Sequence, residues 1–415
     1  MNVFFFSQEF KVSKAFLVLA DGTVFEGQSI GAKGSSIGET VFTTGMTGYL
    51  ETLTDPSYFG QIVTQTFPLI GNYGIIPEDY ESKKSWVRGY IVRELCDLPS
   101  NFRCSGDLDS FLKNQNIVGI CGIDTRALTK KLREAGVMNG MIMSSEKCPD
   151  VTDELLAKIK AYRVEKSVET VSSSELGIRN AELGIDDGFI KYNSIAKTWP
   201  ETNHNIYHIK KPVRIVLWDF GAKYNIQREL EKRGAEVIVV PYSYTAEDIL
   251  KLNPDGIMLS NGPGDPSDNV GIIREINKLC EYNLRLSGEA TRNSLPIFGI
   301  CLGHQMLALA RGAKTSKLKY GHRGGNHPVK DMETGRVYIS SQNHGYAVEN
   351  DTLPSYAKLA FTNSNDGTCE GVTYTDIPAF SVQFHPEACG GPHDTNYLFD
   401  KFVNMIDVRK KHKEI

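Results

Sequence analysis

The chain of 415 residues contains no apolar run that approaches the length of a membrane span. Its first six residues include an apolar stretch that is too short for a signal-peptide core and has no basic residue ahead of it. The eight cysteines include no Cys-x-x-Cys pair, and a chain of this size needs no disulfide staples. We therefore expect reduced thiols and a cytoplasmic location.

The sequence also lacks a large charge of one sign and a nucleotide-binding signature. Its formal net charge is -4, with both signs interspersed, so no general electrostatic field favours nucleic acid or an acidic membrane. We expect neither as a partner. No Gly-x-x-x-x-Gly-Lys-Ser/Thr loop is present, so any ATP chemistry is expected on another chain.

One group of residues has a spacing that could suggest metal ligands: His385, Cys389 and His393. Proline and glycine at positions 386 and 390–392 forbid the continuous helix that would align them. We therefore expect no metal site in this chain.

The length of the chain exceeds what one hydrophobic core usually occupies, so two domains are expected. Residues 1–150 have a mixed pattern that predicts a β-rich α+β domain, with a hairpin around Asp21-Gly22 and a helix from Asp124 to Gly136. Residues 151–210 are polar and predict a connecting region. No catalytic feature stands out in residues 1–150, so a scaffold or docking role is favoured there.

From residue 211 to 408 the pattern alternates between strands and helices. Strands at 213–220, 236–241 and 256–260 are separated by helices at 224–232 and 246–252, and a further strand ends at Cys301. This alternation predicts an α/β fold with a mostly parallel sheet flanked by helices. Ligands then belong at the carboxyl ends of the strands, where Cys301 and the loop 262–264 lie.

Cys301 stands where a short apolar strand runs directly into a helix, within the motif PIFGICLGHQ at 296–305. Glycines on both sides allow a sharp turn, and unpaired amides at the start of the helix can polarise a substrate carbonyl. This corner suits a nucleophile. The alternative is a free cysteine packed as a small hydrophobe, so partner residues must decide.

The candidate partners are His385 and Glu387, in the motif FSVQFHPE at 380–387. In extended geometry both side chains can lie on one face. His385 would take the proton from Cys301, and Glu387 would hold the imidazole in the right tautomer. His304 and His344 are rival bases: His304 is expected to project into neighbouring packing, and His344 is expected to order a loop.

These motifs together resemble the triad, or class I, glutamine amidotransferases. Further motifs narrow the resemblance to the small, glutamine-hydrolysing subunits of carbamoyl-phosphate synthetase: SNGPGDP at 260–266, GHRGGNHPVK at 321–330, QNHGY at 342–346, GMTGY at 45–49, LTDPSY at 53–58 and GIDTR at 122–126. The N-terminal motifs single out this family, because the C-terminal motifs alone fit several synthases. The resemblance covers nearly the whole chain.

The resemblance implies the roles of individual residues. Cys301, His385 and Glu387 would be catalytic, and the backbone amides of Leu302 and Gly264 would stabilise the oxyanion. The L-glutamine contacts would be Ser57, Gly262, Gly264, Leu302, Gln305, Asn343, Gly345 and Tyr346. Tyr346 departs from the phenylalanine frequent in the family, and segment 283–294 is longer than usual and is expected to be a surface excursion.

The resemblance also implies an activity. The chain would hydrolyse L-glutamine through a glutamyl thioester and pass ammonia to a large subunit, which makes carbamoyl phosphate from bicarbonate and ATP for arginine and pyrimidine biosynthesis. No cofactor is expected in this chain, and ATP and Mg are expected on the large subunit. The N-terminal domain would then dock the large subunit.

Two alternatives remain open at this point. The first is a non-catalytic, amidotransferase-like assembly module, against which the intact cysteine, histidine and glutamate argue. The second is a stand-alone thiol hydrolase of γ-glutamyl amides, which the N-terminal motifs make less favourable.

Overall fold

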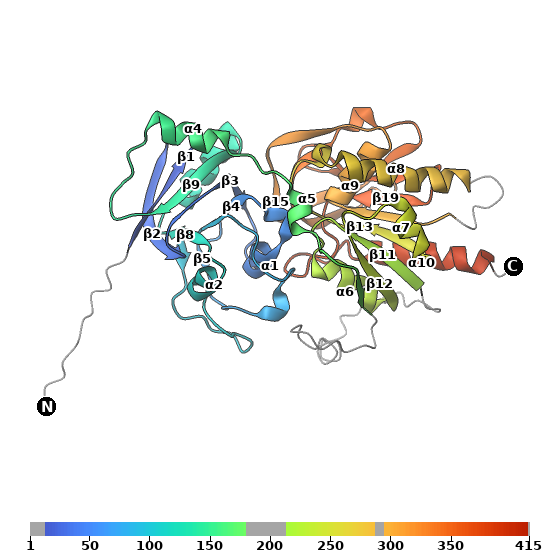
Figure 1. The fold of residues 1–415 in the computed structure, drawn as a ribbon, viewed down its shortest axis with the longest axis horizontal. Coiled ribbons are helices and arrows are strands. Elements are labelled where there is room, and N and C mark those ends of the chain that lie inside the picture. Colours follow the sequence, from blue (N-terminus) through green and yellow to red (C-terminus); the bar gives the residue numbers. More distant parts are fainter. Residues whose placement is uncertain (1–12, 180–212, 287–293, 414–415) are drawn as a thin grey trace, which may run out of the picture. The chain divides into compact units, whose positions relative to one another are not determined.

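The computed structural model describes residues 13–179, 213–286 and 294–413, and they form two compact units (Figure 1). Unit 1 comprises residues 1–50, 60–79 and 87–163, and unit 2 comprises residues 51–59, 80–86 and 164–415, as far as each is described. Two short segments of the N-terminal half, 51–59 and 80–86, therefore belong to the C-terminal unit. Among the described helices, none is long and apolar enough to cross a membrane.

Unit 1 is built around a closed barrel of seven strands, in the order β1-β2-β8-β6-β4-β3-β9. These strands are β1 (Lys14–Leu19), β2 (Val24–Gly31), β3 (Ser35–Thr43), β4 (Gln61–Gln65), β6 (Gly89–Ile91), β8 (Val118–Cys121) and β9 (Met138–Ser144). Unit 1 also contains a two-stranded sheet, β5 (Leu69–Ile70) with β7 (Glu94–Leu95), and the helices α2 (Leu108–Asn114), α3 (Thr125–Ala135) and α4 (Asp153–Ala161), with a 3-10 turn at Pro77–Asp79. Helix α1 (Tyr49–Thr54) runs from residues of unit 1 into residues of unit 2.

Two local predictions in this unit are confirmed. Strands β1 and β2 pair in antiparallel fashion across the turn at Gly22, which has a φ of +87°. Helix α3 begins after Asp124, whose side chain accepts a hydrogen bond from the N–H of Ala127, and it ends at Gly136. An aspartate cap at one end and a glycine at the other define this helix.

Unit 2 is built around a ten-stranded sheet in the order β10-β12-β11-β13-β14-β19-β18-β17-β15-β16. Strands β12, β11, β13, β14 and β19 run parallel, and the other pairings are antiparallel. The strands are β10 (Gly177–Arg179), β11 (Val213–Asp219), β12 (Ala235–Pro241), β13 (Gly256–Leu259), β14 (Ile297–Ile300), β15 (Thr315–Asp331), β16 (Val337–Val348), β17 (Ala357–Asn363), β18 (Cys369–Tyr374) and β19 (Ala379–Val382).

Helices cover both faces of this sheet (Figure 1), and apolar side chains of the sheet pack against them in two separate clusters. Along β11, Ile215 and Leu217 pack with the helices α6 (Tyr224–Lys232) and α10 (Tyr397–Lys413). Val216 and Trp218 point the other way, toward α7 (Ala246–Lys251), α8 (Val270–Arg285) and α9 (Leu302–Ala310). Successive side chains of the strand thus alternate between the two apolar layers. The predicted α/β class is confirmed, with a β-rich barrel as the other unit.

The remaining described elements of unit 2 are short: α5 (Ser167–Val171) and the 3-10 turns Pro56–Tyr58, Pro266–Asp268 and Asn350–Thr352. The predicted connecting region 151–210 contains α4, α5 and β10 in its described part, and residues 180–210 lie outside the described residues. Of the predicted surface excursion 283–294, residues 287–293 lie outside the described residues.

The turn from β14 into α9 is closely packed around two glycines. A Cβ at Gly303 would lie 2.4 Å from the carbonyl oxygen of Leu259 on β13, and a Cβ at Gly299 would lie 2.9 Å from the backbone of Gly303. Real Cβ atoms do not approach backbone so closely, so any side chain at either position would push α9 away from the sheet. The glycines therefore set the position of the residue between them.

We predict that Gly303→Ala lowers the stability of unit 2 by about 1–3 kcal/mol, because the added methyl group must displace α9 from β13. A matched control is Gly271→Ala in helix α8, where an added Cβ meets no atom within 4 Å. The control should be neutral or stabilising by up to about 1 kcal/mol. The midpoint of thermal unfolding measures both, and equal midpoints for the two variants would contradict the packing argument.

Candidate active site

Cys301 lies at the carboxyl end of β14, immediately before α9, with φ +53° and ψ -104°. A positive φ is costly for a residue with a side chain, and such strain persists only where the surrounding structure imposes it. The N–H of Cys301 donates to the carbonyl of Val382 on β19, at 2.9 Å, and its Sγ donates to the carbonyl of Asn343, at 3.6 Å. The thiol is thereby held in a defined, buried position.

His385 and Glu387 follow β19, the parallel neighbour of β14. The Nδ1 atom of His385 lies 2.6 Å from Oε1 of Glu387, and both residues are buried. The contact is made across a turn that starts at Pro386, and not in the extended geometry that the sequence predicted. Because a carboxylate oxygen only accepts hydrogen bonds, Nδ1 carries the proton and Nε2 is left with a lone pair when the ring is neutral.

The electrostatic surroundings favour the charged forms of this pair. Burial raises the pKa of Glu387, but the charges of His385 and Lys223 lower it well below its usual range. Burial and Lys223 lower the pKa of His385, but Glu387 and Cys301 outweigh them and raise it well above its usual range. The Nε2 atom of His385 is buried and has no hydrogen-bond partner among the described residues. The Cys301 side chain nevertheless contributes to the raised pKa of His385.

Two backbone amides are available near the thiol. Leu302 is the first residue of α9, and Gly264 lies in the loop after β13 with a φ of +90°. No described residue accepts a hydrogen bond from either N–H group. Gly262, in the same loop, approaches Leu302 so closely that an added Cβ would lie 2.7 Å from its side chain. A Cβ added at Gly264 would lie 2.2 Å from Oγ of Ser167, on α5.

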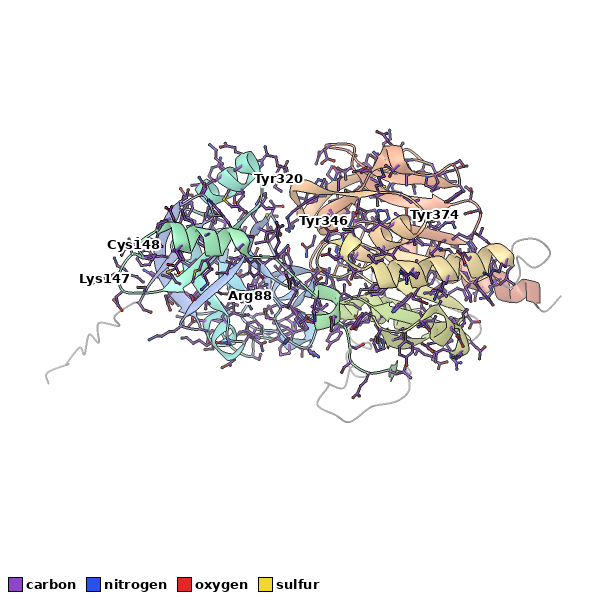
Figure 2. All side chains as sticks on the ribbon, turned by 45° about the horizontal axis from the view of Figure 1, so that its top comes forward. Arg88, Lys147, Cys148, Tyr320, Tyr346 and Tyr374 are labelled. Carbon is purple, nitrogen blue, oxygen red and sulfur yellow. The ribbon has the colours of Figure 1, made fainter. Side chains whose placement is uncertain are left out.

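Four of the other predicted substrate contacts lie on or beside the strand β16. The Nε2 of Gln305 donates to the carbonyl of Tyr346, at 2.7 Å, and to Oε1 of Gln383, at 2.9 Å. The side chain of Tyr346 is half-buried, so its edge reaches the surface (Figure 2). Asn343 and Gly345 lie on the same strand. The structure thus brings Gln305, Asn343, Gly345 and Tyr346 together next to Cys301.

Ser57 belongs to unit 2 although it stands early in the sequence. Its Oγ accepts a hydrogen bond from Nδ2 of Asn261, at 3.0 Å. Asn261 is the residue that precedes Gly262 in the loop after β13. The Oδ1 of Asn261 in turn accepts from the N–H of Lys223, at 3.0 Å. Segment 51–59 therefore contributes directly to the surroundings of the loop after β13.

The rival bases make contacts that leave them neutral. The Nδ1 of His304 lies 2.8 Å from Oγ of Ser381, and burial lowers the pKa of His304 to about 3. The Nδ1 of His344 donates to the carbonyl of Tyr346, at 2.7 Å, and burial holds the pKa of His344 well below its usual range. The expectation of a loop at His344 is wrong, because this residue lies within β16.

Sequence reasoning missed two charged residues beside the pair. The Nζ of Lys223 lies 3.2 Å from Oε1 of Glu387 and 3.7 Å from Oδ2 of Asp55, and all three side chains are nearly inaccessible. A lysine four residues beyond the end of β11 could have been noticed, since ligand sites form at the carboxyl ends of parallel strands. Nothing in the sequence indicated its partners.

Among the described residues, one group of side chains has the donor atoms for a metal ion. Atoms of His322, His344 and Glu370 lie within 4.8 Å of one another. The two nitrogens of His322 face carboxylates, with Nε2 2.8 Å from Asp366 and Nδ1 3.4 Å from Glu370. Burial lowers the pKa of His322, but these carboxylates outweigh it and raise the pKa. Both ring nitrogens of His322 therefore already face carboxylates within the protein.

Glu81, in the second short segment of unit 2, is a further buried carboxylate near Lys223. Its carboxylate accepts hydrogen bonds from the N–H of Asn225, at 3.1 Å, and from Nδ2 of the same residue, at 2.9 Å. Burial is the largest influence and raises the pKa of Glu81 to about 7, although Lys223 and Arg228 oppose the rise. The folded protein therefore holds a proton at Glu81 more tightly than the unfolded chain does.

We predict that this group makes the protein less stable as pH rises from about 4.5 to about 7. Its contribution is fully present below the unfolded pKa, declines by about 3 kcal/mol across the window, and is constant above it. Glu81→Gln removes the titration, so its stability relative to wild type should improve across the same window. Thermal unfolding of both proteins from pH 5 to 8 tests this, and parallel curves would contradict it.

The chain is similar to known proteins over most of its length. Residues 17–142 match the family described as "Carbamoyl-phosphate synthase small chain, CPSase domain", and residues 216–405 match "Glutamine amidotransferase class-I". The carbamoyl phosphate synthase small chain of Fusobacterium nucleatum is 48% identical over 397 residues, covering 95% of this chain and 99% of its own. That of Clostridium perfringens is 48% identical over 391 residues, covering 94% and 99%. The pyrimidine-specific small chain of Bacillus subtilis is 46% identical over 403 residues, covering 97% and 98%.

Proposed function

Because the chain belongs to the carbamoyl-phosphate synthase small chain family and contains a class-I glutamine amidotransferase domain, we propose that it hydrolyses L-glutamine at Cys301. The ammonia released supplies a large chain that makes carbamoyl phosphate. The observation that carries this proposal is the buried His385–Glu387 pair, with an Nε2 free of other partners, beside a strained cysteine at a strand end.

The reaction begins with attack of the Cys301 sulfur on the side-chain amide of glutamine. The proton of the thiol goes to Nε2 of His385, and Glu387 stabilises the imidazolium that forms. The free N–H groups of Leu302 and Gly264 suit the negative oxygen of the tetrahedral intermediate, and one such donor is typically worth about a hundred- to a thousand-fold in rate. Neither amide has an acceptor among the described residues.

The tetrahedral intermediate collapses when His385 gives its proton to the departing nitrogen, which leaves as ammonia. The glutamyl group remains on Cys301 as a thioester. A water molecule that loses its proton to His385 then attacks the thioester, glutamate leaves, and the thiol is regenerated. The raised pKa of His385 suits the step in which it acts as an acid.

The remaining predicted residues bind the rest of the glutamine. Gln305 lies on α9, and Asn343, Gly345 and Tyr346 lie on β16. Ser57 lies in the 3-10 turn Pro56–Tyr58, and Gly262 lies in the loop after β13. Their amides and hydroxyls suit the α-amino and α-carboxylate groups of the substrate. The half-buried Tyr346 accommodates its hydroxyl, where the family often has phenylalanine, at the edge of the site.

The chain is proposed to work with a large chain, as the name of the family suggests. This chain would need no cofactor of its own, and the large chain would bind ATP and Mg and use bicarbonate. Arginine and pyrimidine biosynthesis consume carbamoyl phosphate, and one relative is named as pyrimidine-specific. Neither nucleic acid nor a membrane is proposed as a partner.

We predict that purified wild-type protein releases glutamate from glutamine and that its large chain raises the rate strongly. Cys301→Ala should lose this release entirely, because the sulfur of Cys301 is the atom that forms the thioester. The assay compares both proteins with and without the large chain. Absence of release under every condition would support a non-catalytic module, and release indifferent to the large chain would support a stand-alone hydrolase.

We predict a smaller loss for Glu387→Ala than for Cys301→Ala. Glu387 orients and stabilises the imidazole, whereas the sulfur forms the covalent bond, and removing an orienting group commonly leaves more residual rate. Measuring kcat for both variants in the presence of the large chain checks the ranking. Equal losses would show that the carboxylate is as necessary as the nucleophile.

A further inference from the structure

We infer that Asp55 is a positioning residue of the glutaminase site, which couples the acceptor of the Cys301 thiol to the His385–Glu387 pair through Asn343 and Lys223. This inference rests on the proposed function. Asp55 stands in the segment 51–59 of unit 2, on the last residue before the 3-10 turn Pro56–Tyr58. Its side chain is 3% exposed, so every contact it makes is with protein.

Both oxygens of Asp55 are engaged. Oδ1 accepts a hydrogen bond from the N–H of Ser57, at 2.8 Å, which fixes the turn that carries this proposed substrate contact. Oδ2 accepts from Nδ2 of Asn343, at 3.0 Å, and lies 3.7 Å from Nζ of Lys223. A single buried carboxylate therefore connects three elements of the site.

The branch through Asn343 reaches the nucleophile. The carbonyl of Asn343 accepts the hydrogen bond from Sγ of Cys301, at 3.6 Å, while its side chain is held by Asp55. The hydrogen bond to Asp55 thus helps to fix residue 343, whose backbone carbonyl is the acceptor that orients the sulfur. Misplacement of a reacting group by about 1 Å can cost about a hundredfold in rate.

The branch through Lys223 reaches the acid–base pair. Oε1 of Glu387 is shared by Nδ1 of His385, at 2.6 Å, and by Nζ of Lys223, at 3.2 Å. Two cationic groups thus compete for one oxygen. Asp55 draws the ammonium from the other side, so that Glu387 is not pulled away from His385.

Loss of the charge on Asp55 has a definite consequence. In Asp55→Asn the amide nitrogen would replace Oδ2 or Oδ1. If it replaces Oδ2, it faces two donors, Nδ2 of Asn343 and Nζ of Lys223. If it replaces Oδ1, it faces the N–H of Ser57. In both orientations a buried donor meets a donor, and Lys223 loses its second counter-charge.

The charges around the pair predict opposite pH effects for the two partners. The titratable groups that face His385 are Glu387, Lys223 and Cys301, and those that face Lys223 are Asp55, Glu387 and Glu81. Lys223→Met removes a positive charge and raises the pKa of His385. Asp55→Asn removes a negative charge and lowers it. The alkaline limb of the kcat/KM profile follows this pKa, because the imidazolium donates its proton to the amide nitrogen that leaves as ammonia.

The experiment measures glutaminase kcat/KM against pH for the chain assembled with its large chain. Asp55→Asn should lower kcat about ten- to a hundredfold and move the alkaline limb to lower pH. Lys223→Met should move the same limb to higher pH. Asp55→Glu, which keeps the charge, should retain the wild-type position of the limb. The control is Asp376→Asn, which changes a carboxylate paired with Arg311 and should leave the profile unchanged.

Several outcomes overturn the inference. If the alkaline limbs of Asp55→Asn and Lys223→Met move in the same direction, or do not move, Asp55 only supports the fold. Equal kinetics for Asp55→Asn and Asp376→Asn would lead to the same conclusion. Thermal unfolding identifies any variant that fails to fold, and Asp55→Glu then carries the test. If wild type releases no glutamate, or Cys301→Ala still releases it, the proposed function fails instead, so the two failures are distinguishable.

Discussion

The parallel pairing of β14 with β19 is the constraint on which the site depends. It aligns the carboxyl ends of the two strands, so that Cys301 follows one strand while His385 and Glu387 follow the next. The hydrogen bond from the N–H of Cys301 to the carbonyl of Val382 extends this pairing to the nucleophile itself. Residues far apart in sequence therefore meet without any flexible loop having to bring them together.

Packing around the corner then decides the shape of the site. Gly299 and Gly303 let α9 approach β13 and β14, and the close approach imposes the positive φ of Cys301. The strain is maintained by two apolar layers, one on each face of the sheet. The stability of the core thus holds the thiol in a conformation that an isolated strand and helix would avoid.

Much of this architecture could be predicted from the sequence, because it is local. Alternating apolar patterns predicted β11, α6 and β12 to within a residue or two, and Asp124 and Gly136 marked the ends of α3. The corner at Cys301 was evident from its glycines. Each of these features is decided by neighbouring residues and by strand or helix periodicity.

What could not be predicted depends on contacts between distant segments. The hydrogen bond from Asn343 to Asp55, and the position of Lys223 between Asp55 and Glu387, have no periodic signature. The LTDPSY motif lies within the range 1–150 that the sequence predicted as one domain, whereas the compact units assign segments 51–59 and 80–86 to the C-terminal unit. Division of the chain into consecutive ranges could not reveal this interleaving.

Buried charge explains why such segments would be retained beside the site. Lys223 lies among Asp55, Glu81 and Glu387, and His322 lies between Asp366 and Glu370. The ammonium of Lys223 costs free energy to bury and is tolerated because carboxylates surround it. Apolar residues of the same size would make a more stable fold, so these groups contribute something other than stability. For Lys223 the geometry identifies that contribution, since its ammonium touches the same oxygen that orients His385.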